Sequence, residues 1–99
     1  MKREFKPGDI VKHFKREKMT DEDLKKNPMG YLYLIVGTSR HTETNEELMI
    51  YKPLYDAETM RGVDYAARPR EMFMSEVDHD KYPEVKQKYR FELLEDKHE

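Results

Sequence analysis

The sequence predicts a small, mainly β protein with one or two short helices on its surface. Three observations carry this prediction. Several short segments alternate apolar and polar residues with the period of strands. Turn-forming glycine, proline, asparagine and aspartate separate these segments. Helical patterns occur only as short insertions between them. A barrel or sandwich of five or six strands is the architecture that this order favours.

Length and composition agree with a single folded domain over residues 1–99. A domain of this size buries roughly two-thirds of the surface of its unfolded chain, which is enough for an ordinary core. Charged residues make up 40% of the chain and hydrophobic ones 36%, with a formal net charge of −2. Seven tyrosines and four phenylalanines supply the bulk that disordered chains lack.

Features that are absent from the sequence limit the cellular compartment and the kinds of site that we expect. It has no cysteine, which excludes disulfide scaffolds, thiolate zinc sites and cysteine nucleophiles and fits the cytoplasm. The basic start has no apolar run behind it, so it does not read as a signal peptide. The longest apolar stretch, "YLYLIVG", is too short to span a membrane. We therefore expect a cytoplasmic protein without membrane contact.

The first strand is predicted over Asp9 to Phe14, directly after the turn signal Pro7-Gly8. Residues 16–28 read as a helical insertion. Thr20 and Asp23 form a capping-box pattern at its start, and acidic residues early with lysines late suit the helix dipole. Asn27-Pro28 ends the helix, which we expect over Thr20 to Lys26 on the surface.

Two long strands follow, over 30–39 and 47–55. Both faces of each are apolar, which predicts central strands covered on both sides. Pro53 cannot donate to a ladder and marks an edge or a bulge near the strand end. The remaining elements are expected to be a fourth strand over 63–69, a helical turn over 70–73, a fifth strand over 74–77, a short helix near Pro83 and a last strand over 88–94. Residues 95–99, with His98, read as a frayed tail.

Three pieces of the chain carry a resemblance: "KHFK" with "YLYLIVG", "SRHTETNEELMIYKPLY", and "ARPREMFMSEV". In this order they resemble a small bacterial family known as domain of unknown function 1653, whose members look like SH3-like β-barrels. The resemblance implies a partly open SH3-like barrel of five or six strands. The insertion 16–28 and an extension over 79–94 make the chain look like a longer subgroup. Residues that match the family's motif are Arg40, His41, Thr42, Glu43, Thr44, Tyr51, Tyr55, Arg68 and Pro69. The family implies no catalytic residues.

The loop "RHTET" admits a structural and a functional interpretation. As structure, Thr42, Thr44 and Asn45 would bond the loop's own backbone, because a loop of about nine residues must satisfy its backbone groups. Arg40 would then pair with a nearby carboxylate, and Arg68 would approach the same loop from the adjoining corner. As function, the loop would present His41 to a ligand beside Tyr51.

A metal-dependent enzyme is the main alternative. His41 and Glu43 could contribute to a metal site, but at least a third ligand is needed, for which His13 or Asp9 would have to lie beside the loop. In "DHD", residues 78–80, Asp80 reads as a cap of the following helix. The sequence contains no Gly-rich phosphate loop, nucleophile elbow or Walker lysine.

We therefore expect a non-catalytic binding module that needs no cofactor and no metal. Its ligand would be a peptide, a protein or an anionic group. A second alternative is weak nucleic-acid binding through the basic N-terminal segment, where residues 1–18 carry seven Lys/Arg against three Asp/Glu. The predicted ligand-binding residues are Arg40, His41, Thr42, Glu43, Tyr51, Tyr55 and Arg68.

Overall fold

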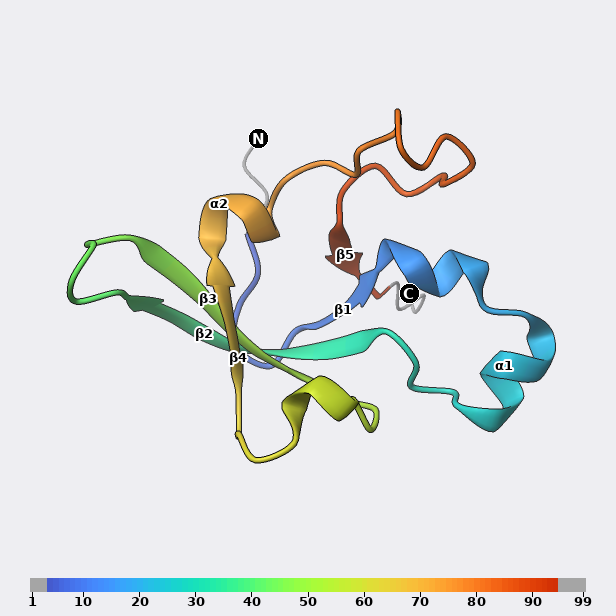
Figure 1. Ribbon diagram of the computed structural model, residues 1–99, viewed down its shortest axis with the longest axis horizontal. Coiled ribbons are helices and arrows are strands. Elements are labelled where there is room, and N and C mark those ends of the chain that lie inside the picture. Colours follow the sequence, from blue (N-terminus) through green and yellow to red (C-terminus); the bar gives the residue numbers. More distant parts are fainter. Residues whose placement is uncertain (1–3, 95–99) are drawn as a thin grey trace.

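Five strands form one antiparallel sheet in the order β4-β3-β2-β1-β5 (Figure 1). The computed structural model describes residues 4–94, so the tail predicted over 95–99 and the first three residues of the basic segment lie outside the described residues. The strands are β1 Ile10–His13, β2 Leu32–Arg40, β3 Glu47–Pro53, β4 Ala66–Pro69 and β5 Phe91–Leu93. The helices are α1 Asp21–Lys26 and α2 Arg70–Phe73, with 3-10 turns η1 Phe14–Lys18 and η2 Glu58–Met60.

The predicted mainly β fold with two short helices is confirmed. The sheet is not closed into a barrel, because the outer strands β4 and β5 each pair on one side only. Consecutive strands β2, β3 and β4 pair in order, and the last strand pairs with the first. Between residues 4 and 94, no helix is long and apolar enough to cross a membrane.

Strand β2 lies at the centre of the sheet, as its two apolar faces predicted. Leu32 and Ile35 point to opposite faces and are both buried. The pairing with β3 shifts between Ile35 and Gly37, which places a bulge in β2. Pro53 ends β3, as expected of a residue that cannot donate to the ladder.

The main core covers one face of the sheet. Phe73, carried by α2, and Phe91, on β5, stack with ring centroids 3.9 Å apart and 5° between the ring planes. Both rings are essentially inaccessible to solvent. Other buried members come from the three middle strands: Val11, Ile35, Met49 and Tyr51.

Helix α1 confirms the local prediction. The Thr20 hydroxyl accepts from the backbone N–H of Asp23, and the Asp23 carboxylate accepts from the N–H of Thr20, both at 3.0 Å. The helix buries no residue and stands away from the sheet (Figure 1). It ends at Lys26, before Asn27-Pro28.

The C-terminal part departs from the prediction. The fourth strand begins at Ala66 instead of residue 63, and the last strand is confined to Phe91–Leu93. Residues 74–77 form no strand, only a single bridge between Glu76 and Tyr89. The helix expected near Pro83 is replaced by turns. The helix cap predicted at Asp80 is therefore wrong, and the Asp78 carboxylate instead accepts from the N–H groups of Asp80 and Lys81 within a turn.

Long-range contacts explain these departures. Val77 and Val85 pack with Phe14 and half-buried Tyr82 in a second small core. The Glu17 carboxylate accepts from the N–H groups of Lys86 and Gln87 at 2.9 and 2.6 Å. The backbone donors of Lys86 and Gln87 are thus satisfied by a residue about 70 positions away in the chain, without a helix or strand.

Candidate functional site

The predicted loop over 41–46 is bonded to itself, as the structural interpretation required. Nδ1 of His41 accepts from the N–H groups of Glu43 and Thr44 at 3.2 and 3.4 Å. The Thr44 hydroxyl accepts from the N–H of Glu46 at 3.2 Å. Thr42, Thr44 and Asn45 were the predicted acceptors, and among the described contacts only Thr44 accepts such a bond. His41 accepts two. Asn45 instead supplies a left-handed backbone, with φ 68°.

Both arginine contacts predicted for this loop are wrong. The Arg40 guanidinium donates to the backbone carbonyl of Asn45 at 3.2 Å instead of to a carboxylate. Arg68 lies opposite Met49 in the β3–β4 register, on the sheet face that carries Tyr51, and donates to the Tyr51 hydroxyl. The register therefore sends its side chain to the sheet and not to the loop.

The alternative metal site at His41 and Glu43 gains no support. Within residues 4–94 no three histidine or carboxylate side chains are placed to hold a metal ion. Nδ1 of His41 is also already engaged by two backbone donors.

Three of the predicted ligand-binding residues do come together. Tyr51 and Tyr55 both pack edge-on against Tyr33, with ring centroids 5.6 and 5.7 Å from it. The hydroxyls of Tyr33 and Tyr55 are 2.7 Å apart and share a hydrogen bond. Nε of Arg68 donates to the Tyr51 hydroxyl at 3.3 Å.

The other four predicted residues lie elsewhere. In the strand register, Arg40 lies opposite Glu47 at the closed end of the β2–β3 hairpin, and Tyr33 lies opposite Pro53 at the open end. Arg40 follows Tyr33 by seven positions in β2, which corresponds to about 23 Å along the strand. The tip of the hairpin lies at one end of β2 and β3 (Figure 1), and the register places Tyr33 toward the other end. His41, Thr42 and Glu43 belong to the tip.

Residues outside the predicted ligand-binding set complete this cluster. The His13 ring lies 5.8 Å from the Tyr31 ring and 5.0 Å from the Phe91 ring. Tyr31, just before β2, has a left-handed backbone with φ 61° and packs 5.8 Å from Tyr55. The pairing of His13 with Phe91 joins the two ends of the chain, which strand periodicity alone does not indicate. We call the complete set the tyrosine face: His13, Tyr31, Tyr33, Tyr51, Tyr55, Arg68 and Phe91.

Burial shifts the pKa of two groups of the tyrosine face, His13 and Tyr33. Burial, followed by the nearby charges of Lys15, Arg68 and Arg90, lowers the pKa of His13 from 6.5 to about 4. Nδ1 of His13 accepts from the N–H of Lys15 at 3.1 Å, so the proton of the neutral ring resides on Nε2. Burial, together with the hydrogen bond to Tyr55, raises the pKa of Tyr33 well above its usual value.

Arg68 is the charged group of the tyrosine face. Besides Tyr51, its guanidinium contacts the Met72 sulfur at 3.7 Å and lies 6.0 Å from the centre of the Phe91 ring. It is half-buried, and no carboxylate of residues 4–94 forms an ion pair with it. A guanidinium in such a position is suited to bind a carboxylate or phosphate from outside.

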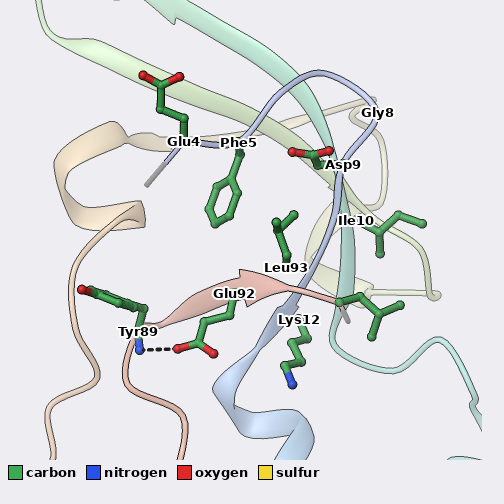
Figure 2. Close-up of a pocket in the computed structure, with 10 residues that line it drawn as sticks. Glu4, Phe5, Gly8, Asp9, Ile10, Lys12, Tyr89, Glu92 and Leu93 are labelled. Atoms are coloured by element: carbon green, nitrogen blue, oxygen red, sulfur yellow. Dashed lines mark hydrogen bonds between the residues drawn. The ribbon is translucent and has the colours of Figure 1, made fainter. Parts of the chain in front are cut away.

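A hollow with a volume of about 970 Å³ lies elsewhere, along the edge strand β5. Figure 2 shows Phe5, Ile10 and Leu93 on its walls. Two of its carboxylates are engaged by backbone donors: Glu92 accepts from Lys88 and Tyr89, and Asp9 accepts from Lys6. These bonds fix local turns, so we place the candidate site on the tyrosine face.

Comparison with known proteins gives one match. Residues 9–93 match the family described as "Protein of unknown function (DUF1653)". Neither the curated proteins nor the solved structures gave a match.

Proposed function

The chain belongs to the DUF1653 family, and from this premise we propose that it is a non-catalytic binding module whose tyrosine face holds an acidic peptide segment of another protein. One observation carries the proposal. The half-buried Arg68 has a phenol, a thioether and an aromatic ring as its described neighbours, and none of them neutralises its charge. A carboxylate of the peptide would do so, through a charge-assisted hydrogen bond.

Charge favours an acidic ligand over a cationic one. Aromatic clusters often bind cations, but here Lys15, Arg68 and Arg90 lie close enough to lower the pKa of His13. The same positive charges would repel a lysine or a methylated ammonium group and attract a carboxylate.

Shape and chemistry favour a peptide. Tyr31 and Tyr55 are half-buried and offer ring surface for an apolar side chain of the ligand. The paired hydroxyls of the half-buried Tyr33 and Tyr55 offer hydrogen-bonding capacity for peptide amides. Catalysis has less support, because His13 uses Nδ1 as a cap and the raised pKa of Tyr33 disfavours a phenolate.

The finer fold assignment is part of this proposal. Pairing of the last strand with the first is the connectivity that a partly open SH3-like barrel requires, and it supports that kinship. Bacterial origin and a cytoplasmic location stay predictions. Nucleic-acid binding through the basic N-terminal segment also stays a prediction, and no contact among residues 4–94 favours it over a peptide.

Binding of a fluorescently labelled peptide, Glu-Glu-Phe-Glu-Glu, tests the proposal by fluorescence anisotropy. The matching Gln-Gln-Phe-Gln-Gln peptide has no side-chain charge, so the difference between the two affinities measures how much the carboxylates contribute to binding. Arg68→Met should weaken binding of the acidic peptide about tenfold or more, because one buried charge-assisted bond is lost. Arg61→Met is the matched control, since Arg61 is exposed and contacts Asp56. Equal binding of the two peptides, or equal affinity of the two variants, would contradict the proposal.

Single-stranded DNA of similar charge serves as the competitor. If it displaces the acidic peptide and binds Arg68→Met as well as the parent protein, the nucleic-acid alternative replaces the peptide.

A further inference from the structure

A second, smaller pocket lies on the other side of His13. It has a volume of about 260 Å³. It forms where β1 passes into η1 and meets the segment 78–90, and the N–H of Phe14 donates to the carbonyl of Arg90 at 3.1 Å across this junction. Its lining residues are His13, Phe14, Lys15, Asp78, Lys81, Tyr82 and Arg90.

The lining of this pocket carries an excess of positive charge. Three cations, Lys15, Lys81 and Arg90, face one carboxylate, that of Asp78. Oδ1 of Asp78 already accepts from two backbone N–H groups and serves the turn. None of the three cations is in an ion pair with a carboxylate within residues 4–94. The ammonium of Lys81 lies 5.5 Å from the centre of the Tyr82 ring.

The effect of these cations is felt by a neighbouring group. Lys15 and Arg90 both contribute to the lowered pKa of His13, after the larger effect of burial. Lys15 and Arg90 thus act on the same ring, and Lys81 lines the same pocket. Positive charge that converges on a concave surface attracts anions.

The remaining walls are aromatic. The Phe14 ring stacks on His13, with centroids 4.4 Å apart, and lies 5.0 Å from the Tyr82 ring. The volume is below the range of about 300–1,000 Å³ typical of drug-sized ligands. It leaves room for one tetrahedral anion with a small organic group, and too little for a nucleotide.

We infer that this pocket binds the phosphate group of a small phosphate monoester, with Lys15, Lys81 and Arg90 around the phosphate and the Phe14 and Tyr82 rings beside its organic part. The pocket shares His13 with the tyrosine face, but Arg68, which carries the proposal of an acidic peptide, does not line it. Its failure is therefore distinguishable from failure of the peptide site, since Arg68 is not among its lining residues.

Amide chemical shifts of the full ¹⁵N-labelled chain test the inference, with phenyl phosphate and inorganic phosphate as probes and sodium chloride at equal ionic strength as reference. Phenyl phosphate should shift the amides of Phe14, Lys15 and Lys81 saturably at millimolar concentration. It should bind more tightly than inorganic phosphate, because only the ester reaches the aromatic walls.

The variants Lys15→Met and Lys81→Met remove charges from exposed side chains and should not disturb folding. Each should raise the Kd for phenyl phosphate about tenfold, the equivalent of one charge-assisted bond. Lys52→Met, on exposed strand surface, and Arg68→Met should leave that Kd unchanged. Shifts that do not saturate, shifts equally produced by chloride, or an unchanged Kd in Lys81→Met would each overturn the inference.

Discussion

His13 shows how burial, together with neighbouring positive charges, can set the protonation of one residue. Its ring packs between Phe14, Tyr31 and Phe91, and its Nδ1 caps η1. Protonation would place a charge in this packed environment, beside Lys15 and Arg90. The folded protein therefore keeps the imidazole neutral down to a pH of about 4.

This protonation makes stability depend on pH. The pKa is about 4 in the folded state against 6.5 without the surroundings, so the unfolded chain binds the proton first. Stability contributed by neutral His13 is complete above 6.5 and is lost as the pH falls towards 4. The loss is on the order of 3 kcal/mol. Urea unfolding at several pH values should show it in the parent chain and much less of it in His13→Asn, which keeps a capping acceptor. Parallel pH profiles of the two proteins would refute this account of His13.

The hairpin loop offers a matched pair of threonines. Thr44 accepts a hydrogen bond from the N–H of Glu46, and no contact of this kind is made by Thr42 in the described structure. Thr44→Val should lower the unfolding free energy by about 0.5–1 kcal/mol, while Thr42→Val should be nearly neutral. Thermal unfolding of both variants measures the difference. Equal losses in both would mean that Thr44 does not support the loop.

For single residues, the sequence predicted that the loop would form internal hydrogen bonds, but it did not predict which side chains would form each contact. The self-bonded loop was predictable, because the backbone N–H groups of a short polar loop have few acceptors other than the loop's own side chains. That His41 would be the main acceptor was not, since it depends on the turn conformation. Arg68 was predicted as a binding residue, yet its neighbours Tyr51 and Met72 follow from a strand register that a sequence does not display.

Among the elements, the segment 75–90 depends most on distant contacts. Glu17 in η1 accepts from two of its backbone N–H groups. The amide of the buried Gln87 donates to the carbonyls of Lys12 and Tyr89. A carboxylate and an amide therefore replace the ladder that a strand would have formed.

Removing this carboxylate should loosen the whole segment. Glu17→Ala leaves two backbone donors without their charged acceptor, and we expect a loss of about 2 kcal/mol in unfolding free energy. Hydrogen exchange of the Lys86 and Gln87 amides should accelerate together with it. Glu22→Ala is the control, because its exposed pair with Lys26 contributes only about 0.3 kcal/mol. If exchange at these two amides is the same in both variants, Glu17 does not hold the segment.

Helices and strands that depend on contacts close in the sequence were predicted correctly, and those that depend on distant contacts were not. Helix α1 was predicted with its capping box because Thr20 and Asp23 are three residues apart. The central position of β2 followed from its two apolar faces. The strand predicted over 74–77 and the helix near Pro83 are wrong. Residues 75–77 bond to the segment 88–90, and the N–H groups of Lys86 and Gln87 bond to Glu17, about 70 positions away.

For the molecule as a whole, net charge conceals the distribution of charge. The formal net charge is −2, yet the cations around His13 gather on two sides of one ring. Arg68 lies with the tyrosines on one side, and Lys15, Lys81 and Arg90 surround the small pocket on the other. From this arrangement we propose two sites for negatively charged ligands on a slightly acidic protein.

The side-chain Nε–H resonance of Arg68 tests the central claim most directly. In ¹⁵N-labelled protein titrated with the Glu-Glu-Phe-Glu-Glu peptide, we expect this resonance and the amides around Tyr51 and Tyr55 to shift along one saturating curve. The curve should give the Kd obtained by anisotropy, since both measurements report a carboxylate on the guanidinium. A saturable shift confined to the hairpin tip around His41, with Arg68 unmoved, would contradict the assignment of the binding site to the tyrosine face.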